Sequence, residues 1–391
     1  MEGPRRKRPR DVVRNPFRGS KPLCPPASRL RCHPMQDGAA PLYQTSFGTA
    51  YVGDSLVGMA EELEDESVSL FFTSPPFALS RKKEYGNKSE TEYIDWFRHF
   101  ALVMWDKLRE DGSVVIDLGG AWRKGSPTRS LYQFKVLIEL CEGLGDRCFH
   151  LAQEFYWYNP SKMPLPAQWV NVERCRVKDS VNVVWWLSKT PRPKANNRNV
   201  LRPYSPDMER LLERQSYNGG RRPGGANVNP LTWKKRHEGA IPPNVVELPF
   251  VSNDEANDAA LMNFLRIGGS ESASRYHRAC TALAKHFAEQ EMDGRDRFRK
   301  HPARFPVQLP TFFVRLLTEE GDLVVDPFAG SNVTGQAAED ERRSWKAFEL
   351  HRHYLEPSVA RFDAYFKGDF EWLDEDRPPL LDDLSPDQLT A

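Results

Sequence analysis

Segments typical of strands alternate with segments typical of helices along both halves of the chain, and this alternation constrains the fold most. Short apolar runs predict strands at residues 48–52, 68–72, 114–116, 155–157, 181–187, 323–325 and 345–348. Apolar residues at helical spacing predict helices at 55–63, with Ser55 as N-cap, and at 92–109, 131–144, 311–317, 332–341 and 354–366. Strands that alternate with helices are typical of an α/β sheet with helices on both faces.

The regular pattern is interrupted once, from about residue 190 to residue 301, where clusters of proline and glycine replace sustained periodicity. Such a stretch predicts an irregular insert within the α/β domain. The chain has 391 residues, and we expect it to divide into five parts. These are a disordered basic segment (1–42), the first half of the α/β domain (43–190), the insert (191–300), the second half (301–368) and an acidic tail (369–391).

Charge is distributed unevenly, although the formal net charge is only +1. Residues 1–20 contain seven Arg or Lys and two acidic residues, residues 190–240 contain eleven and four, and residues 369–391 contain one and eight. The basic middle stretch lies inside the folded part, so it is the better candidate for a surface that faces phosphates. The two ends are poor in periodic apolar residues, and we interpret them as disordered, solvated segments.

Several classes of protein are disfavoured. No apolar run approaches the roughly 20 residues of a spanning helix, which excludes a transmembrane protein. The basic start has no apolar stretch behind it, so we expect no secretory signal. The six cysteines include no CxxC pair, which argues against a zinc site and against a disulfide scaffold. We therefore expect a cytoplasmic protein without a bound metal.

One loop suited to ligand binding runs from Asp326 to Asn332, between an apolar strand and the helix that follows it. Ligands of open α/β sheets bind at the carboxyl ends of strands, and Gly330 lets the backbone approach a ligand there. Asp326 offers acceptor oxygens that suit an ammonium or a hydroxyl group. About twenty residues further on, Glu349 ends the next strand, where a carboxylate commonly accepts ribose hydroxyls. An ordinary strand-to-helix turn is the alternative.

A second loop, Thr73-Ser74-Pro75-Pro76-Phe77, also follows a strand directly. Its two prolines fix the backbone and remove two N–H donors. What remains is a row of acceptors, the Ser74 hydroxyl oxygen and nearby carbonyls, beside the aromatic face of Phe77. This arrangement suits an exocyclic amino group that is held through its two hydrogens while its ring stacks on Phe77. A rigid turn with Phe77 in the core is the alternative, and the pentapeptide alone favours it.

Together, the two loops resemble a known family. Residues 73–77 resemble the catalytic loop of DNA amino-methyltransferases, and residues 326–331 resemble their cofactor loop. The catalytic loop precedes the cofactor loop, which is the permuted order of the β class of this family. The likeness covers roughly residues 43–365 and continues in Gly53-Asp54-Ser55-Leu56, in residues 77–87, 185–190 and 301–306, and in Phe348-Glu349.

The resemblance implies a Rossmann-like sheet of an S-adenosylmethionine-dependent methyltransferase. Residues 43–190 then form the catalytic half, residues 191–300 a target-recognition insert and residues 301–368 the cofactor-binding half. Serine at position 74, where the family also uses Asp or Asn, implies methylation of cytosine N4; adenine-N6 methylation on the same scaffold stays open. Asn332 replaces the family's usual glycine, and asparagine tolerates the left-handed backbone conformation.

The resemblance also implies roles for the residues of the two loops. Ser74 and the Pro75 carbonyl are expected to accept the amino hydrogens of the target base, next to Pro76 and the stacking ring of Phe77. Glu349 is expected to bind the ribose hydroxyls of S-adenosylmethionine. Asp54 is expected to bind its adenine amino group, with helix capping as the alternative role. The other expected cofactor contacts are Asp326, Phe328, Gly330 and Ser331, and Phe305 and Pro306 at the methionine end.

Double-stranded DNA is the expected partner, with the target base flipped out of the helix. A restriction endonuclease is expected as a functional partner that need not touch this protein, and the oligomeric state stays open. Methylation of a ring carbon is rejected because no cysteine follows a proline to serve as nucleophile. An RNA methyltransferase and a non-catalytic DNA-binding module remain alternatives. The candidate DNA contacts are Arg192, Lys194, Arg198, Arg221, Arg222, Lys234, Lys235 and Arg236.

Overall fold

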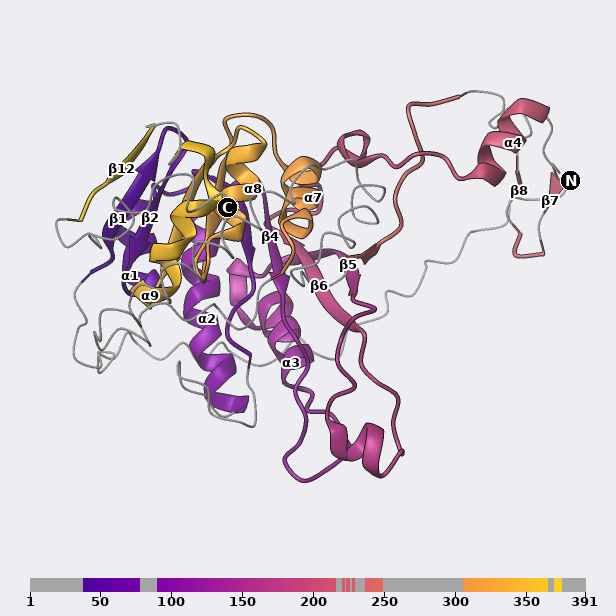
Figure 1. Ribbon diagram of the computed structural model, residues 1–391, viewed down its shortest axis with the longest axis horizontal. Helices are drawn as coiled ribbons and strands as arrows, with labels where there is room; N and C mark the ends of the chain where they lie inside the picture. The colour runs from indigo at the N-terminus through magenta and orange to yellow at the C-terminus, as the bar shows by residue number, and fades with distance from the viewer. Residues whose placement is uncertain are drawn as a thin grey trace, which may run out of the picture. The chain divides into compact units, whose positions relative to one another are not determined.

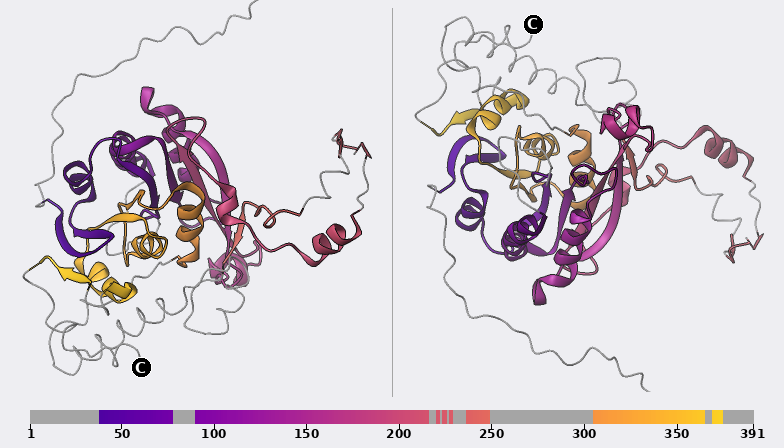
Figure 2. Two further views of the ribbon diagram at one scale, coloured as in Figure 1. Left: turned by 90° about the horizontal axis from the view of Figure 1, so that it is seen from above. Right: turned by 90° about the horizontal axis from the view of Figure 1, so that it is seen from below.

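The computed structural model describes residues 38–77, 90–215, 220–221, 223–225, 227–228, 236–248, 305–364 and 369–374. One sheet of ten strands organises this part of the chain, in the order β12-β1-β2-β11-β10-β3-β4-β6-β5-β9. Figure 1 labels β12, β1 and β2 toward one end of this order and β4, β6 and β5 toward the other. Two further views show helices on both sides of the sheet (Figure 2). The α/β class predicted from the alternation of strands and helices is therefore confirmed.

The centre of the sheet consists of five parallel strands drawn from both halves of the chain. The first half provides β2 (Gly48–Val52), β3 (Val68–Thr73) and β4 (Leu108–Asp117), and the second half provides β10 (Leu323–Asp326) and β11 (Ser344–Glu349). β10 and β11 pair with each other and lie between β2 and β3. The carboxyl ends of all five strands consequently meet at one edge of the sheet, which we call the carboxyl edge.

Further strands extend the sheet on both sides. β1 (Ala40–Thr45) and β12 (Phe370–Trp372) lie beyond β2, and β6 (Val181–Ser188), β5 (His150–Tyr158) and β9 (Val245–Glu247) lie beyond β4. β6 is antiparallel to β4, and β5 is antiparallel to β6, so β5 runs in the same direction as β4. The connection between β5 and β6 therefore also emerges at the carboxyl edge.

Alternate side chains of the central strands pack into two cores, one on each face of the sheet. In β3, Leu70 and Phe72 belong to one core, while Phe71 belongs to the other. In β4, Val115 belongs to the first core and Val114 to the second. Successive side chains of a strand point to opposite faces, so a strand that is buried on both faces is apolar along its length.

Helices cover both faces and provide the other wall of each core. The first core is covered by α7 (Gln308–Leu317), α8 (Val333–Asp340) and a 3-10 helix (Glu356–Arg361). The second core is covered by α1 (Ser55–Glu62), α2 (Glu90–Lys107) and α3 (Tyr132–Ile138). None of the helices in the described ranges has the length and apolar character needed to cross a bilayer.

Two predicted helices are shorter and less regular than their periodicity suggests. The helix predicted at 131–144 is α3 followed by a π-helical turn, Glu139–Gly143. The helix predicted at 354–366 consists of α9 (Arg352–Leu355) and the 3-10 helix that follows it. Pro357 lies in the first turn of that 3-10 helix, and because proline has no N–H it cannot continue the hydrogen bonding of α9.

The outer limits of the fold and one helix cap also differ from the prediction. β1 begins at Ala40, inside the segment predicted to be disordered, and β12 lies inside the predicted acidic tail. These two short strands pair with each other, a long-range contact that local periodicity does not reveal. Asp54, and not Ser55, caps α1, since its Oδ1 accepts the N–H of Leu56 at 2.8 Å. Residues 1–37 and 375–391 lie outside the described residues.

Only parts of the predicted insert are described, and its boundaries remain predictions. A 3-10 helix, Asn197–Val200, follows Asn196, whose N–H donates to the Leu316 carbonyl of α7 at 2.8 Å. α4 (Pro206–Arg214) begins with Ser205 as N-cap and with proline at its first position, a favourable start for a helix. The short strands β7 (Gly220–Arg221) and β8 (Asn227–Val228) pair with each other.

Candidate active site

The carboxyl edge brings together the two loops that the sequence singles out. The loop after β3 and the loop after β10 leave neighbouring parallel strands, because Phe71 of β3 is in register with Val325 of β10. β4 and β11 flank this pair and end in Asp117 and Glu349. Both loops and two further carboxylates therefore belong to one region of the molecule.

A direct hydrogen bond joins the two loops. The Thr73 hydroxyl donates to Asp326 Oδ1 at 2.8 Å, although the two residues are 253 positions apart in the chain. Both side chains are buried. Because Ser74 follows Thr73 directly, the serine of the predicted catalytic loop lies next to the carboxylate that begins the predicted cofactor loop.

The protein itself engages both oxygens of Asp326. Besides Thr73, Oδ1 accepts the N–H of Phe328 at 3.0 Å, and Oδ2 accepts the Thr334 hydroxyl at 2.6 Å. Burial raises the pKa of Asp326 to about 6, even though these hydrogen bonds act in the opposite direction. Asp326 shapes the loop, because its hydrogen bonds reach Thr73 of β3 and Thr334 of α8.

Glu349 is a buried acceptor at the end of β11. Its Oε2 accepts the N–H of Gly330 at 2.8 Å, and its Oε1 accepts the N–H of His351 at 2.9 Å. Burial, together with the nearby Asp326 carboxylate, raises the pKa of Glu349 to about 7, although the hydrogen bonds from backbone N–H groups act in the opposite direction. Each oxygen keeps a second lone pair, so the side chain is suited to accept hydroxyl groups of a ligand.

Asp54 lies near Glu349, because β2 and β11 are neighbours and end together. Val52 is in register with Glu349, and the Gly53 N–H donates to the Glu349 carbonyl at 3.0 Å. Asp54 is only partly buried, and Oδ1 serves as the cap of α1. The capping role, which the sequence left as an alternative, is thus present, and it occupies only one of the two carboxylate oxygens.

The backbone of the loop after β10 is fixed from behind. Gly330 and Asn332 both have left-handed φ angles, +53° and +50°. The Asn332 side chain accepts the N–H of Gly335 at 3.1 Å, which makes it the N-cap of α8. Arg361 donates to the Ser331 carbonyl at 2.6 Å and to its hydroxyl at 3.0 Å. Asparagine thus supports the turn at the position where the resemblance leads one to expect glycine.

Three further residues predicted at the cofactor site lie in or beside the two cores. Phe328 is partly buried, and its ring packs against Phe100 of α2 with 4.7 Å between centroids. Phe305 packs edge-on against Phe72 of β3 at 5.3 Å. Pro306 is buried directly before α7. Phe305 and Phe328 thus contact opposite faces of the sheet, since Phe72 and Phe100 belong to different cores.

The loop after β3 holds a half-buried serine whose proton already has an acceptor. The Ser74 hydroxyl donates to Asp117 Oδ2 at 3.2 Å, so the lone pairs of its oxygen remain for another donor. Pro75 is buried, and Pro76 and Phe77 are partly buried. The Phe77 ring lies against Gly119, where an added Cβ would come within 2.5 Å of it. The absence of a side chain at Gly119 therefore leaves space for the Phe77 ring.

Asp117 is the residue of this site that the sequence analysis missed. It is the last residue of β4, it is buried, and its Oδ1 has no hydrogen-bond partner among the described residues. Burial raises the pKa of Asp117 to about 7, while Ser74, Lys162 and Asn182 lower it. Lys162 donates to Asn182 at 2.7 Å. An acidic residue directly after Val114-Val115-Ile116 was the available signal, since it ends a buried strand.

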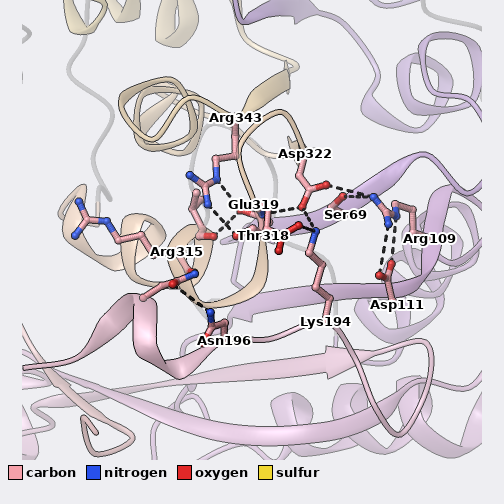
Figure 3. Close-up of polar contacts among 12 residues, drawn as sticks. Ser69, Arg109, Asp111, Lys194, Asn196, Arg315, Thr318, Glu319, Asp322 and Arg343 are labelled. Atoms are coloured by element: carbon pink, nitrogen blue, oxygen red, sulfur yellow. Dashed lines mark hydrogen bonds and ion pairs between the residues drawn. The ribbon is translucent and has the colours of Figure 1, made fainter. Parts of the chain in front are cut away.

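The predicted DNA contacts lie in different surroundings. Arg192 and Arg198 are exposed, whereas Lys194 forms ion pairs with Asp322 at 2.7 Å and with Glu319 at 3.0 Å (Figure 3). Arg236 forms an exposed ion pair with Glu209. Arg221 belongs to β7, and nothing is described of its side chain. The remaining three, Arg222, Lys234 and Lys235, lie outside the described residues.

Comparison with known proteins identifies the family. Residues 68–360, which include both loops and the strands that carry them, match the family N6_N4_Mtase, described as DNA methylase. The chain belongs to this family of DNA methylases. The type II methyltransferase M.PvuII of Proteus hauseri is 46% identical over 327 residues, which cover 83% of this chain and 86% of the relative.

A solved structure and a second relative also match this chain. The solved structure of the PvuII DNA methyltransferase (cytosine-N4-specific) superposes with a TM-score of 0.60 and 38% identity, over 89% of this chain and 91% of that one. The type II methyltransferase M.BglI of Bacillus subtilis is 36% identical over 66 residues, which are 17% of this chain and 19% of the relative. The predicted methyltransferase fold is therefore confirmed over most of the described chain.

Proposed function

We propose that this DNA methylase transfers a methyl group from S-adenosylmethionine to the exocyclic N4 of a flipped-out cytosine in double-stranded DNA. The proposal is supported above all by the hydrogen bond from Thr73 to Asp326, which joins the segment of Ser74 to the loop proposed to bind the cofactor. The similarity to M.PvuII over most of both chains supports cytosine N4 as the target atom. Protection of DNA in a type II restriction-modification system is the corresponding biological role.

The residues at the ends of β2, β10 and β11 fit S-adenosylmethionine, which supplies an electrophilic methyl group on a sulfonium. Glu349 is a fixed, buried acceptor for ribose hydroxyls, because two backbone N–H groups hold its carboxylate in place. Asp54 retains one carboxylate oxygen for an amino group. Gly330 and Ser331 present their backbone on a turn that Arg361 holds rigid. Phe305, Pro306 and Phe328 would provide apolar contacts.

Ser74 is proposed to bind the amino group of the base. The N4 lone pair of cytosine is delocalised into the ring and is a poor nucleophile. The Ser74 proton is directed to Asp117, so the serine oxygen and the Pro75 carbonyl can accept the two amino hydrogens. These bonds favour tetrahedral geometry at the nitrogen and place its lone pair toward the methyl donor. Positioning of the reactants then supplies much of the catalysis.

Asp117 is proposed to act behind Ser74. Methylation leaves the amino nitrogen with one proton too many, and that proton must depart. Ser74 can accept it while its own hydroxyl proton passes to Asp117 Oδ2, 3.2 Å away. A carboxyl with a pKa of about 7 is well suited to accept a proton near neutral pH.

Base flipping costs a few kcal/mol, and stacking on an aromatic ring returns roughly 1–3 kcal/mol. Phe77, beside Ser74, is the proposed stacking partner. Phosphate contacts would supply the remainder, and we propose the exposed Arg192 and Arg198 among them, together with Arg221, Arg222, Lys234, Lys235 and Arg236 of the insert. We omit Lys194, because its ammonium is engaged by Asp322 and Glu319.

Nucleoside mass spectrometry of DNA from cells that express the protein tests the proposal. N4-methylcytosine above the background of the host is the expected product, and the Ser74→Ala protein should give far less. N6-methyladenine would instead support the second target on the same scaffold. A modified RNA would replace the DNA substrate, and absence of any modified nucleoside would support the non-catalytic alternative.

A further inference from the structure

Two segments at the carboxyl edge form a projecting surface that lies outside the predicted insert. The first is the loop 118–130 between β4 and α3, and the second is the connection 159–180 between β5 and β6. Figure 1 shows both segments extending away from the sheet in the same direction, next to each other. We call them together the arm. Both segments start at strand ends on the carboxyl edge, as the loop after β3 does.

Direct contacts hold the two segments of the arm together. Arg129 forms an ion pair with Asp179 at 2.6 Å, and Arg176 donates to the Pro127 carbonyl. The guanidinium groups of Arg176 and Arg129 lie over the Trp122 ring, at 3.9 Å and 5.0 Å from its centroid. Stacking of arginine on an indole favours one arrangement of the two segments. The arm is therefore a preformed surface.

The arm is strongly basic. Loop 118–130 contains three Arg or Lys and no acidic residue, and connection 159–180 contains four Arg or Lys and two acidic residues, a net excess of five positive charges. Arg123, Lys124 and Arg174 are exposed, and none of them pairs with an acidic side chain of the described ranges. Lys178 is also exposed and, among the described residues, donates only to the Pro160 carbonyl, at 2.9 Å. Unpaired positive charge of this kind attracts a polyanion.

The arm also exposes apolar side chains between the charged ones. Met163, Leu165, Val172 and Val177 have relative exposures of 67%, 58%, 68% and 85%. Proteins that deform DNA place such side chains against base steps, with basic residues beside them on the phosphates. A protein partner would also cover apolar residues, but the excess of positive charge and the position at the carboxyl edge favour DNA.

The base of the arm reaches the catalytic loop. Lys162, at the start of the β5–β6 connection, donates to Asn182 at 2.7 Å, and both residues lie close enough to Asp117 to lower its pKa. Asp117 in turn holds the hydroxyl proton of Ser74. DNA that lies along the arm would therefore pass close to the residue proposed to bind the target base.

We propose that the arm binds the backbone of double-stranded DNA beside the active site, through Arg123, Lys124 and Arg174. This inference rests on the proposed function, since it concerns the same DNA substrate, and it adds a second DNA-binding surface to the predicted insert. The contacts are with phosphates, so they act on DNA of any sequence and hold the duplex while the insert selects the site.

Fluorescence anisotropy with the full chain and a 30-base-pair duplex of mixed sequence tests the arm. The Arg123→Ala/Arg174→Ala double variant should raise Kd roughly tenfold at 0.1 M salt, and it should reduce the slope of log Kd against log salt by about 1.8, or about 0.9 for each phosphate contact. An Arg123→Lys/Arg174→Lys variant keeps the charge and should stay within about twofold of the wild type.

A matched control removes two positive charges from the opposite edge of the sheet. Arg147 precedes β5 and Arg342 precedes β11, each in a partly exposed ion pair. The Arg147→Ala/Arg342→Ala variant should bind DNA within about twofold of the wild type. If the arm variant has the same Kd and salt slope as this control, the proposal is wrong. The same holds if the arm variant changes only the concentration dependence of sedimentation, which would indicate a protein interface.

Two further measurements separate failure of the arm from failure of the proposed function. Thermal unfolding and S-adenosylmethionine binding report whether the arm variant is intact. Nucleoside analysis of the wild type reports whether DNA is methylated at all. Methylation by the wild type combined with unchanged DNA binding by the arm variant rejects the arm alone, whereas an unmodified genome rejects the proposed function without bearing on the anisotropy result.

Discussion

The carboxylates at the two edges of the central sheet differ in whether they form ion pairs and in the direction of their pKa shifts. At the carboxyl edge, Asp117, Asp326 and Glu349 are buried, and no Lys, Arg or His of the described residues forms an ion pair with them. Burial raises the pKa of all three. At the opposite edge, where the central strands begin and which we call the amino edge, Asp322 pairs with Lys194 at 2.7 Å and with Arg109 at 3.2 Å (Figure 3).

The pKa of Asp322 is lowered, the opposite of the shift at the carboxyl edge. Burial alone would raise it, but the hydrogen bond and the charge of Lys194 outweigh burial. Neighbouring contacts complete the cluster, since Arg343 donates to the Thr318 carbonyl at 2.8 Å. The amino edge compensates its charges and stabilises the fold, whereas the carboxyl edge retains buried carboxylates that have no ion-pair partner among the described residues, as expected where ligands and protons must be bound.

Removal of the serine hydroxyl should have the largest effect. Ser74→Ala leaves the fold and the residues around Glu349 intact, but it removes an acceptor for the amino group and the link to Asp117. We expect methyl transfer to fall by about two orders of magnitude or more. Single-turnover transfer of a labelled methyl group measures the rate, and calorimetric titration with S-adenosylmethionine should give a nearly unchanged Kd. Turnover equal to wild type would refute the role.

Asp117→Asn tests the uncompensated carboxylate. An ionised Asp117 is needed to accept the proton from Ser74, so turnover of the wild type should rise with pH through about 7. The variant should be slower by roughly tenfold to a hundredfold, and the rise near pH 7 should disappear. Rates measured from pH 5.5 to 8.5 decide this. A variant that retains the same inflection shows that another group titrates.

The same substitution has a predicted effect on stability, and the sign follows from the raised pKa. Between pH 4 and pH 7 the folded protein retains a proton on Asp117 that the unfolded chain has released. Its contribution to stability is therefore present at low pH and is lost as the pH rises toward 7. Asp117→Asn should flatten the decline in melting temperature over this interval, and a steeper decline would contradict the assignment.

Glu349→Ala tests the cofactor side of the carboxyl edge. Loss of the acceptor for the ribose hydroxyls should weaken S-adenosylmethionine binding about tenfold, or about 1.4 kcal/mol. Glu349→Gln keeps one carbonyl oxygen, so it should lose less. Calorimetry with the purified proteins gives both values, and an alanine variant that binds as tightly as wild type would remove Glu349 from the site.

Asp322→Asn at the amino edge should have the smallest effect, and on stability alone. It removes the charge that pairs with Lys194 and Arg109, which should cost about 1 kcal/mol of unfolding free energy. The pKa of Asp322 is lowered, so its contribution is present above pH 4 and is lost as the pH falls below it. Urea unfolding at pH 7 measures the loss. Unchanged turnover under conditions where the variant is folded would confirm the contrast between the edges.

Local sequence patterns were sufficient for the centre of the fold. The strands at 68–72 and 323–325 and the loops that follow them were predictable, because continuous apolar runs end there at proline and glycine. The resemblance then placed both loops in one site, which the bond between Thr73 and Asp326 now supports. The order of the strands follows from contacts between distant segments, and no local pattern encodes it.

Contacts that depend on tertiary structure were missed. β1 and β12 are short, and both depend on pairing within the sheet: β12 pairs with β1, and β1 pairs with β12 and with β2. The engagement of Lys194 by Asp322 follows from the meeting of two loops 128 positions apart. Asp117 was overlooked because an acidic residue at the end of a buried strand is a weak signal by itself, and its role becomes visible only when the neighbouring strand places Ser74 beside it.

The position of β10 between β11 and β3 has a consequence for synthesis of the protein. The strand that fills the middle of the sheet leaves the ribosome 253 positions after the residue with which it bonds. At about 5–20 residues per second, translation of that interval takes roughly 13 to 50 s. During this time the exposed edge of β3 has no partner from β10, so the nascent chain must be kept from pairing with other chains, and no methylation can begin before β10 has been synthesised.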